Sequence, residues 1–554
     1  MMRKLLQSSM LLLWLWARVG VAAEASTTRS LDDFENVTAW SAHPADGVEV
    51  RISQDTGAKG RSMRLDFRFV KGGGYAVVRR ALEVDLPEHY RFRFRIRGEA
   101  PVNNLEFKLA DASGENVWWS NQRDFHFPRT WQPVTLQQRH ITFAWGPLGG
   151  GALHHAASLE FAITAGSGGQ GTVWIDELEL ETLPPPDAAL PEIVATASSV
   201  TGAGAAEAAL DGDATTAWQS AAPDTGARLT LDLGTDREFD GLTLQWRAQQ
   251  RARDYDLEGS ADGREWLMLR RVRGGTGELD RLHLPDHEAR WLRVHVRRGP
   301  ASGVALAELR VEPIGWAPTR ADLLRRIAQE SRRGLYPRGV LGEMAFWTVV
   351  GADDDREEGL LGEDGALETR KASFTVEPFI HLGDSLLTWA DVAREQTLAR
   401  GDLPLPSVRW IHPRVALTVS VCPEGAAGRS SLVARYRVRN PGMSTLQGTL
   451  YLALRPFQVN PPVQFLNTPG GAAPIRRIEF RGGEVIVNRE RIVRVLVPPG
   501  AFGAVNSDGG DIVADFLATG HLPSATRVSD TEARASAALA YPFKLAPGAE
   551  REIS

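Results

Sequence analysis

The sequence predicts an all-β protein of three β-sandwich or jelly-roll domains in tandem, with one short connecting helix. Gly (54) and Pro (32) are frequent in the 554 residues, and segments with helical periodicity are rare. Short runs that alternate apolar and charged residues recur between turn-forming residues, which is typical of antiparallel sheets with one buried face. At about 150 residues per domain, the length corresponds to roughly three to four domains.

The net charge of the chain is small, because 63 Lys and Arg residues face 69 Asp and Glu residues. This balance predicts neither nucleic acid nor an anionic membrane surface as a partner. Cys422 is the only cysteine, so the sequence predicts no disulfide framework. Stability is therefore expected from large hydrophobic cores, with bound metal ions as a further candidate source.

Residues 1–25 have the organisation of a signal peptide. A basic start precedes the apolar run Leu11–Trp16, and small residues around Ala23 suit a cleavage site. An uncleaved anchor is the alternative, but Arg18 interrupts a run that is already shorter than the ~20 residues of a membrane-spanning helix. We expect a secreted, periplasmic or cell-surface protein with no transmembrane segment after cleavage.

The first predicted domain covers residues 28–183 and is expected to be a β-sandwich. Met63–Phe69 and Arg91–Arg97 alternate strictly between apolar and charged residues, as half-buried strands do. Further predicted strands, separated by Gly-rich turns, are 75–78, 105–109, 159–163 and 173–180.

Tryptophans in turn-rich stretches are the candidate ligand-binding residues of this domain. Exposed indole rings offer apolar faces on which sugar rings stack, so Trp118, Trp119 and Trp145 are candidates, whereas core packing is the alternative for each. The arginines at 91, 93, 95 and 97 form a second feature. They predict either a solvated sheet face or, on a concave face, a preference for acidic glycans.

The two ends of this domain resemble those of the jelly-roll carbohydrate-binding modules found beside bacterial glycosidases. The resemblance rests on Leu31–Glu35 at the opening and Val173–Leu178 at the close. It implies a jelly roll whose first and last strands share a structural Ca²⁺. The residues implied as its ligands are Asp33, Glu35 and Asp176.

A Pro-rich linker, residues 184–190, separates this domain from a second one at residues 191–313. Near its start, the segment Glu207–Trp218 places Asp211, Asp213 and Thr216 in one Gly-containing turn. Ca²⁺ takes six to eight oxygen ligands and suits such a cluster. The alternative is a turn in which both aspartates bond their own backbone.

The order of motifs in the second domain resembles the discoidin family, also called the coagulation factor five/eight C-type domain, which includes the family 32 carbohydrate-binding modules. After the Asp-Gly-Asp turn come Leu231–Gly234, Ser260–Gly263 and Trp291–Arg293. The resemblance implies a β-jelly roll with a structural Ca²⁺ held by Asp211, Asp213, Thr216 and Glu308. Sugar-binding residues are not implied; Trp246 and Arg247 are candidates, and a core Trp beside a solvated Arg is the alternative.

A connecting helix is predicted within residues 316–334 and a further β-sandwich within 335–554. Thr319 and Asp322 form a capping-box-like start, and an apolar stripe follows. Three stretches, Phe346–Val350, Ser373–Phe379 and Ala453–Pro462, resemble the β-sandwich that precedes the (α/α)₆ barrel of six-hairpin glycosidases. The resemblance implies that catalytic carboxylates lie on a helical barrel after this sandwich.

The leading hypothesis is therefore an exported carbohydrate-binding protein whose partner is a polysaccharide or glycan. It would form the non-catalytic part of a larger glycosidase-like protein. One alternative is a glycoside hydrolase with its active site in the third domain, where Glu343, Glu377, Asp384 and Asp391 are candidate carboxylates with no two marked as a pair. The other is a cell-surface adhesion protein. The sequence marks no catalytic centre.

Overall fold

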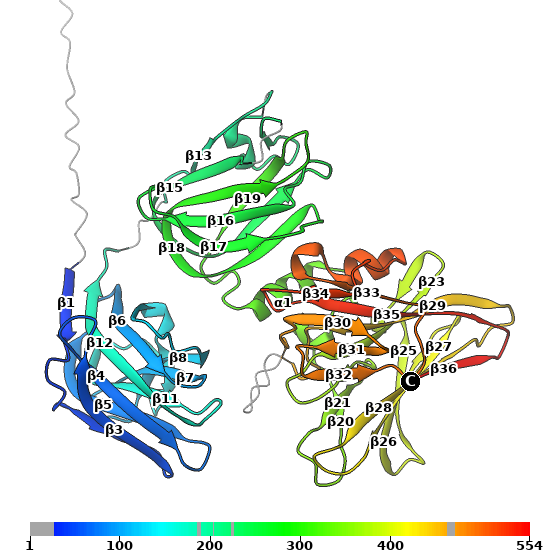
Figure 1. The fold of residues 1–554 in the computed structure, drawn as a ribbon, viewed down its shortest axis with the longest axis horizontal. Helices are drawn as coiled ribbons and strands as arrows, with labels where there is room; N and C mark the ends of the chain where they lie inside the picture. The colour runs from blue at the N-terminus through cyan, green and yellow to red at the C-terminus, as the bar shows by residue number, and fades with distance from the viewer. Residues whose placement is uncertain (1–26, 186–189, 203, 223–225, 462–470) are drawn as a thin grey trace, which may run out of the picture. The chain divides into compact units, whose positions relative to one another are not determined.

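The computed structural model describes residues 27–185, 190–202, 204–222, 226–461 and 471–554. Strands in antiparallel sheets dominate these residues, as Figure 1 shows, so the predicted all-β fold is confirmed. The chain divides after residue 189 into two compact units, and this division falls in the predicted linker. The predicted signal peptide and most of that linker lie outside the described residues.

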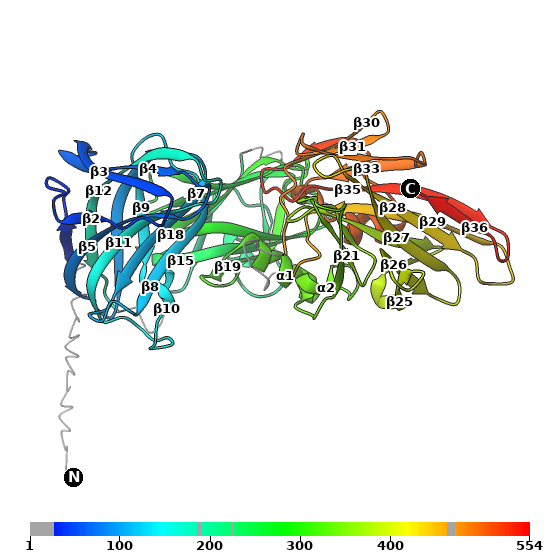
Figure 2. The same cartoon turned by 90° about the horizontal axis from the view of Figure 1, so that it is seen from below.

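Two six-stranded antiparallel sheets make up the first unit (Figure 2). One has the strand order β3-β4-β12-β6-β9, with β1 paired to β12, and the other has the order β10-β8-β7-β11-β5-β2. The strands are β1 (Thr27–Asp32), β2 (Trp40–Ala42), β3 (Val48–Thr56), β4 (Arg61–Phe69), β5 (Tyr75–Asp85), β6 (Tyr90–Glu99), β7 (Asn103–Ala110), β8 (Val117–Phe125), β9 (Gln132–Gln137), β10 (Thr142–Trp145), β11 (His155–Thr164) and β12 (Gln170–Thr182).

Aromatic residues from both sheets join the two layers of the first unit. Phe92 of β6 lies 4.9 Å from Phe107 of β7, and Phe94 lies 5.1 Å from Phe161 of β11, measured between ring centroids. These rings are buried because strand alternation directs every second residue to the inside. All six predicted strands of this domain are present, most of them longer than predicted.

Three arginines of β6 lie on the outer face of the first sheet and pair with acidic residues of the adjacent β12, whereas the fourth, Arg97, stacks on the Trp174 ring of β12. Arg91 and Arg93 both contact Glu181, at 2.7 and 3.3 Å, and Arg95 contacts Glu177 at 2.6 Å. Their charge is neutralised across the strand pair. The alternative of an arginine surface for acidic glycans therefore loses its support.

The second unit begins with a seven-stranded antiparallel sheet in the order β14-β19-β15-β18-β16-β17, with β13 paired to β15. Its apolar residues form one core cluster that includes Trp218, Trp246 and Tyr255. The strands are β13 (Val194–Ala197), β14 (Trp218–Gln219), β15 (Arg228–Trp246), β16 (Asp254–Ser260), β17 (Leu267–Val272), β18 (Leu279–Arg298) and β19 (Ala305–Pro313).

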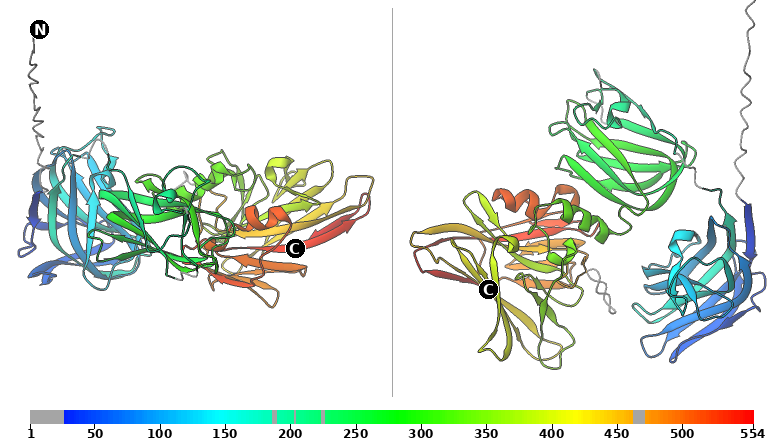
Figure 3. Two further views of the ribbon diagram at one scale, coloured as in Figure 1. Left: turned by 90° about the horizontal axis from the view of Figure 1, so that it is seen from above. Right: turned by 180° about the vertical axis from the view of Figure 1, so that it is seen from behind.

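The rest of the second unit contains the predicted helix, α1 (Arg320–Glu330), which Thr319 caps by accepting a hydrogen bond from the backbone N–H of Asp322 at 3.1 Å. A second short helix, α2 (Arg338–Leu341), and helical turns between Ile512 and Thr519 were not predicted. With α1 they pack on one face of an eight-stranded sheet, beside which Figure 3 shows them. The other face of that sheet shares a core with a five-stranded sheet.

The eight-stranded sheet has the order β20-β21-β22-β23-β29-β35-β33, with β24 paired to β23, and the five-stranded sheet has the order β25-β26-β27-β28-β36. A small sheet, β32-β31-β30-β34, takes in strands that were predicted as part of the sandwich. The strands are β20 (Trp347–Val350), β21 (Gly359–Gly362), β22 (Leu367–Glu368), β23 (Thr375–Leu382), β24 (Ser385–Leu387), β25 (Ala393–Ala399), β26 (Leu403–Ile411), β27 (Ala416–Glu424), β28 (Ser431–Arg439), β29 (Leu446–Arg455), β30 (Arg477–Arg481), β31 (Glu484–Val487), β32 (Arg491–Arg494), β33 (Ala501–Val505), β34 (Arg527–Ser529), β35 (Ser536–Leu545) and β36 (Glu550–Ile553).

Candidate functional site

The outer face of the sheet β10-β8-β7-β11-β5-β2 is the strongest candidate site in the first unit. On β7, Leu105, Phe107 and Leu109 belong to the core. Alternation therefore turns Glu106 and Lys108 to the outer face. Register then places further side chains on that face, and we call this set the Trp119 face: Arg79, Glu106, Lys108, Trp119, Asn121, Trp145, Glu160 and Thr164.

Two tryptophans lie together at the β10 edge of the Trp119 face. The ring centroids of Trp119 and Trp145 are 5.5 Å apart and the ring planes are inclined by 82°. Trp145 is 47% exposed, so one large apolar ring is open to solvent. The Lys108 ammonium lies 5.5 Å from the Trp145 centroid and 5.9 Å from the Trp119 centroid, where it fixes the rings by cation–π attraction.

Trp118 differs from these neighbours, because it is 3% exposed and packs in the core. Its indole N–H donates to the carbonyl of Gly151 at 2.7 Å. Adjacent residues of a strand point to opposite faces. Of the three tryptophans predicted as ligand-binding in this domain, two therefore lie on the outer face and Trp118 is corrected to a core residue.

Paired charges occupy the middle of the Trp119 face. Lys108 contacts Glu106 at 2.8 Å, and the Arg79 Nε donates to Glu160 at 2.5 Å. Two nearby polar atoms, Asn121 Oδ1 and Thr164 Oγ1, are buried without a hydrogen-bond partner in the described part of the chain. Buried polar atoms are rarely left unpaired. This face thus combines an open aromatic ring, balanced charge and spare hydrogen-bonding groups.

Asp211, Asp213 and Thr216 of the second unit form what we call the acidic turn. Its hydrogen bonds are those of the alternative to a metal site, a turn in which the aspartates bond their own backbone. Asp211 Oδ1 accepts from the backbone N–H of Asp213 at 2.9 Å, and Asp211 Oδ2 accepts from the Thr216 hydroxyl at 2.7 Å. Thr216 also donates its backbone N–H to the Asp213 carbonyl at 3.0 Å. The aspartates therefore do stabilise their own turn.

Glu308 of β19 points to the same turn and is the unsatisfied member of the group. Its Oε1 is buried and has no hydrogen-bond partner among the described residues. Burial first, and then the nearby Asp211 carboxylate, raise the pKa of Glu308. An acidic oxygen that is buried, unpartnered and close to other carboxylates has the chemistry of a cation ligand.

No group of three or more His, Cys, Asp or Glu side chains in the described residues is arranged to hold a metal on its own. A Ca²⁺ ion at the acidic turn would therefore need carbonyl or hydroxyl oxygens as well as carboxylates. Both are present, because the Thr216 hydroxyl lies within hydrogen-bond distance of the Asp213 and Ala208 carbonyls, at 2.9 and 3.4 Å. The donor set fits a hard cation.

The residues implied as Ca²⁺ ligands in the first unit have other partners. Asp176 is fully buried, and its carboxylate accepts backbone N–H groups from Ala58, Lys59 and Glu177 at 2.8–3.1 Å. Glu35 accepts from the backbone N–H of Arg61 at 2.9 Å. Asp33 Oδ1 accepts from the backbone N–H of Glu35 at 3.2 Å, whereas the carboxylates of Glu35 and Asp176 bond the 57–61 turn.

The two candidate sugar-binding residues of the second unit lie in different environments. Trp246 is 1% exposed and its indole N–H donates to Asp280 at 2.9 Å, so it is a core residue, as the alternative held. Arg247 is exposed and donates to the Thr215 carbonyl beside the acidic turn. The two therefore do not form one site.

The carboxylates weighed as catalytic in the third region bond to different partners. Glu377 is 4% exposed and contacts Arg455 at 3.2 Å; burial raises its pKa. Glu343 contacts Arg333 at 2.7 Å, and Asp391 caps a helical turn at Thr388 and contacts Arg332 at 3.2 Å. Asp384 lies exposed in the turn between β23 and β24.

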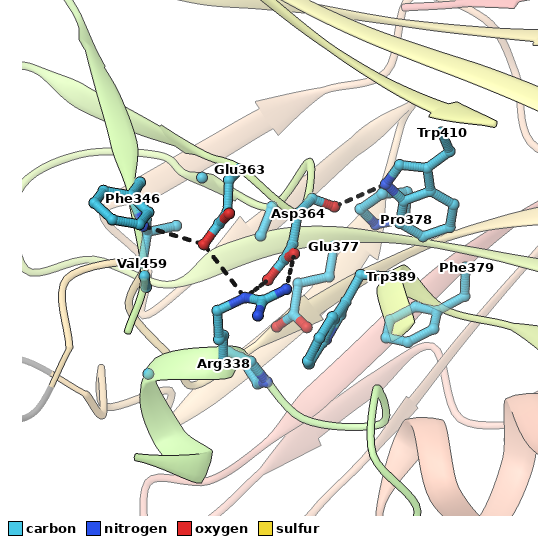
Figure 4. A pocket seen from close by; sticks show the side chains of 15 residues that line it. Arg338, Phe346, Glu363, Asp364, Glu377, Pro378, Phe379, Trp389, Trp410 and Val459 are labelled. Atoms are coloured by element: carbon cyan, nitrogen blue, oxygen red, sulfur yellow. Dashed lines mark hydrogen bonds and ion pairs between the residues drawn. The ribbon is translucent and has the colours of Figure 1, made fainter. Parts of the chain in front are cut away.

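Figure 4 shows the small pocket beside Glu377, where Arg338 lies between Glu363 and Asp364. Arg338 contacts Asp364 at 3.0 Å and Glu363 at 3.3 Å, and its guanidinium lies 4.4 Å from the Trp389 ring centroid. The pocket has a volume of about 30 Å³, the space of roughly one water molecule. It is too small for a sugar ring.

Among the described residues no helix is both long and apolar enough to cross a membrane.

Comparison with known proteins identifies one domain family in the second unit. Residues 194–309 match the F5/8 type C domain, so the predicted discoidin resemblance is confirmed for this segment. A search of curated proteins found no match.

Several solved structures resemble parts of the chain. Chitosan-binding module 1 of a chitosanase/glucanase from Paenibacillus sp. IK-5 is 32% identical, with 21% of this chain and 92% of the module covered and a TM-score of 0.21. A family 32 module from Clostridium perfringens NanJ, in complex with galactose, is 19% identical (22% and 92% covered, TM-score 0.21). A family 11 module from Clostridium thermocellum, in complex with a β-1,3-1,4-mixed-linked tetrasaccharide, is 19% identical (29% and 98% covered, TM-score 0.25).

Proposed function

We propose that this chain is an exported carbohydrate-binding protein and that the Trp119 face is a glycan-binding site. The observation that carries the proposal is the open ring of Trp145, held against Trp119 beside a floor of paired polar groups. Export is part of the proposal because residues 1–25 have the organisation of a signal peptide.

The chemistry of the Trp119 face suits a neutral sugar chain. An indole ring stacks on the apolar face of a pyranose, and hydroxyl groups both donate and accept, so they match the unpartnered oxygens of Asn121 and Thr164. The charges of Lys108 and Arg79 are offset by Glu106 and Glu160. A strongly anionic or cationic polymer would gain little from such a face.

Affinity gel electrophoresis against a panel of soluble polysaccharides, followed by calorimetric titration, tests this proposal. Trp145→Ala is expected to weaken binding by about tenfold or more, because an indole that becomes buried on binding contributes about 1.5–3 kcal/mol. Trp131→Ala is the matched control, since Trp131 is half-buried and stacks with Arg97 of the other sheet. Equal loss in both variants, or no polysaccharide bound by the wild-type chain, would refute the site.

A structural Ca²⁺ at the acidic turn belongs to the same proposal. Asp211, Thr216 and Glu308, with the Asp213 carbonyl, would hold the ion, which supplies only positive charge and cross-linking there. The unpartnered Glu308 oxygen supports this assignment. In the first unit the backbone donors around Asp176 already take up its oxygens, so we propose no ion at Asp33, Glu35 and Asp176.

Association with a glycosidase is the finer part of the proposal. It rests on the resemblance of the third region to the sandwich of six-hairpin glycosidases and on the separation of its candidate carboxylates, which all have structural partners or lie in a turn. Hydrolysis requires two carboxyl groups that flank one bond. Reducing sugar released from a bound polysaccharide by the wild-type chain, and lost in Glu377→Gln, would favour the hydrolase instead.

A further inference from the structure

A cleft of about 510 Å³ opens in the second unit between the F5/8 type C domain and the region that follows it. One side comes from Arg270 of β17 and residues 277–282, and the other from α1, residues 507–515 and Arg534. The volume falls within the range of small-molecule sites. Neither the Trp119 face nor the acidic turn contributes to it.

Arg270 crosses from one side of the cleft to the other. It is 5% exposed, and its guanidinium contacts Asp508 at 2.7 Å and Glu532 at 2.7 Å. Both carboxylate oxygens of Asp508 have partners, because Oδ1 contacts Arg270 and Oδ2 accepts from the backbone N–H of Arg273 at 3.0 Å. The Arg270 Nε, by contrast, is buried and has no hydrogen-bond partner in the part of the chain that the structure describes.

Arg534 lines the same cleft and has no side-chain partner at all. No hydrogen bond or ion pair joins its guanidinium to any residue in the described ranges, and its Nε is buried. Burial and then the neighbouring Arg270 lower the pKa of Arg534, while the nearby carboxylates of Glu532, Asp530 and Asp508 act in the opposite direction. Because a desolvated cation without a hydrogen bond or ion pair is costly, this arginine is a candidate to bind an anionic ligand.

Two further polar groups of the cleft show the same contrast between a satisfied acceptor and an unpartnered donor. The carboxylate of Asp511 is satisfied, because it accepts the N–H groups of Val513 and Ala514 at 2.8 Å and contacts Tyr336 and Arg455 at 3.1 and 3.4 Å. The hydroxyl of Ser507 is buried and has no hydrogen-bond partner within the described ranges. The cleft groups that lack hydrogen-bond partners are therefore able to donate: the Nε atoms of Arg270 and Arg534 and the hydroxyl of Ser507.

We propose that this cleft binds the carboxylate of an acidic sugar residue, a uronate, between Arg534 and Ser507. A guanidinium matches a carboxylate in planar, bidentate geometry, and the cleft has room for one or two sugar rings. The assignment to a sugar rests on the proposed carbohydrate-binding function; the assignment to an anion rests on the unpartnered donors alone. The cleft would add recognition of acidic residues to the neutral preference of the Trp119 face.

Isothermal titration of the full chain with glucuronate, glucose and inorganic sulfate tests the cleft. Glucuronate is expected to bind at least tenfold more tightly than glucose, and Arg534→Gln is expected to weaken it at least tenfold. Arg527→Gln is the matched control, since Arg527 lies seven residues earlier with its side chain 63% exposed. Glucuronate no tighter than glucose, sulfate as tight as glucuronate, or equal binding by Arg534→Gln and the wild type would each overturn the proposal.

Stability provides a second readout that separates a ligand-binding Arg534 from a structural one. Without ligand, Arg534→Gln is expected to melt at or above the wild-type temperature, because it removes an unpaired cation; a clear fall would overturn the proposal. Ser507→Ala, which removes only an unpartnered hydroxyl, is expected to weaken glucuronate binding severalfold with no loss of stability. Trp145→Ala is expected to keep its glucuronate affinity, so failure of the Trp119 face and failure of the cleft are distinguishable.

Discussion

Glu308 is the residue at which the proposed Ca²⁺ has the clearest energetic consequence. Its buried Oε1 has no hydrogen-bond partner among the described residues, and the carboxylates of Asp211 and Asp213 lie close to it. With Ca²⁺ bound, the three negative charges are attracted to one cation. Without it, they repel one another, and the Gly212 backbone N–H and Arg310 only partly offset the cost of the Glu308 charge. Whether a substitution at this residue raises or lowers stability therefore depends on whether Ca²⁺ is bound.

Glu308→Gln is expected to lower the melting temperature of the second unit when Ca²⁺ is present and to leave it unchanged or raise it in EDTA. The wild-type chain is expected to lose several degrees in EDTA, because a ligand that binds only the folded state stabilises it by RT ln(1 + [L]/Kd). Scanning calorimetry measures both effects. Glu265→Gln, an exposed carboxylate of the same domain, is the control and is expected to be indifferent to EDTA. A wild-type melting temperature that EDTA does not change would contradict the ion.

Single residues also show where sequence reasoning reaches its limit. Trp118 and Trp119 are neighbours, and alternation requires that only one of them faces outward. The local pattern does not decide which, because both faces of β8 carry apolar and polar residues, and the core position of Trp118 depends on packing against Phe143 and on the distant Gly151 carbonyl. Trp246 was equally ambiguous until its partner Asp280, 34 residues away, was in place.

At the scale of elements, period-two alternation predicted the strands of the first unit well, because each has one buried and one solvated face. The helical turns between Ile512 and Thr519 were missed. They are short, and only a few of their residues, including Ile512, Val513 and Leu517, are buried against the eight-stranded sheet. Helices of this length show too little periodicity to be recognised before their tertiary partner is known.

The pairing of β5 with β11 carries a pH-sensitive contact. His155 of β11 bonds Asp85 at 2.7 Å and Glu83 at 2.5 Å, and these two carboxylates raise the pKa of His155 above its ordinary 6.5. A histidine whose folded-state pKa is raised stabilises the fold fully below the unfolded pKa. This contribution is lost as the pH rises through the folded pKa.

We therefore expect the first unit to become less stable as the pH rises above about 6.5, and we expect this loss of stability to be absent in His155→Ala. NMR titration of the His155 ring is expected to give a pKa above 6.5 that returns to the ordinary range in the double variant Glu83→Gln, Asp85→Asn. His43, whose ring bonds the hydroxyl of Ser41 at 2.9 Å, is an internal control in the same spectra. A His155 pKa at or below 6.5 would show that the strand pair does not hold the charged form.

At the scale of the whole molecule, the joining of the F5/8 type C domain to the following region depends on contacts that no local pattern encodes. Arg270 and Asp508 are 238 residues apart, and Thr276 donates to the Gly509 carbonyl at 2.7 Å. The sequence predicted two separate domains here, whereas the structure places both in one compact unit. Individual charged residues from both segments meet where they pack together. Such a surface is specified only by the completed fold.

Arg270→Met is expected to destabilise the second unit strongly. The substitution leaves Asp508 without its ion-pair partner and leaves Glu532 with only the more distant Arg320 at 3.6 Å, and the side chains of Asp508 and Glu532 are only 10% and 16% exposed. Removing one partner of a buried ion pair costs about 3–5 kcal/mol, because the remaining charge stays desolvated. Burial already raises the pKa of Asp508 despite its contact with Arg270. The loss of the cation is therefore expected to raise it further, so that part of the lost stability returns at low pH.

Arg290→Met is the matched control for this prediction, because Arg290 contacts Asp232 at 3.0 Å in the same domain while its side chain remains 44% exposed. An exposed pair of this kind contributes about 0–1 kcal/mol. Calorimetry of both variants at neutral pH compares them directly. If Arg270→Met costs no more than Arg290→Met, the two parts of the second unit are held together by their apolar contacts and Arg270 is dispensable. A much larger cost, partly recovered on acidification, would mean that the buried ion pairs join them.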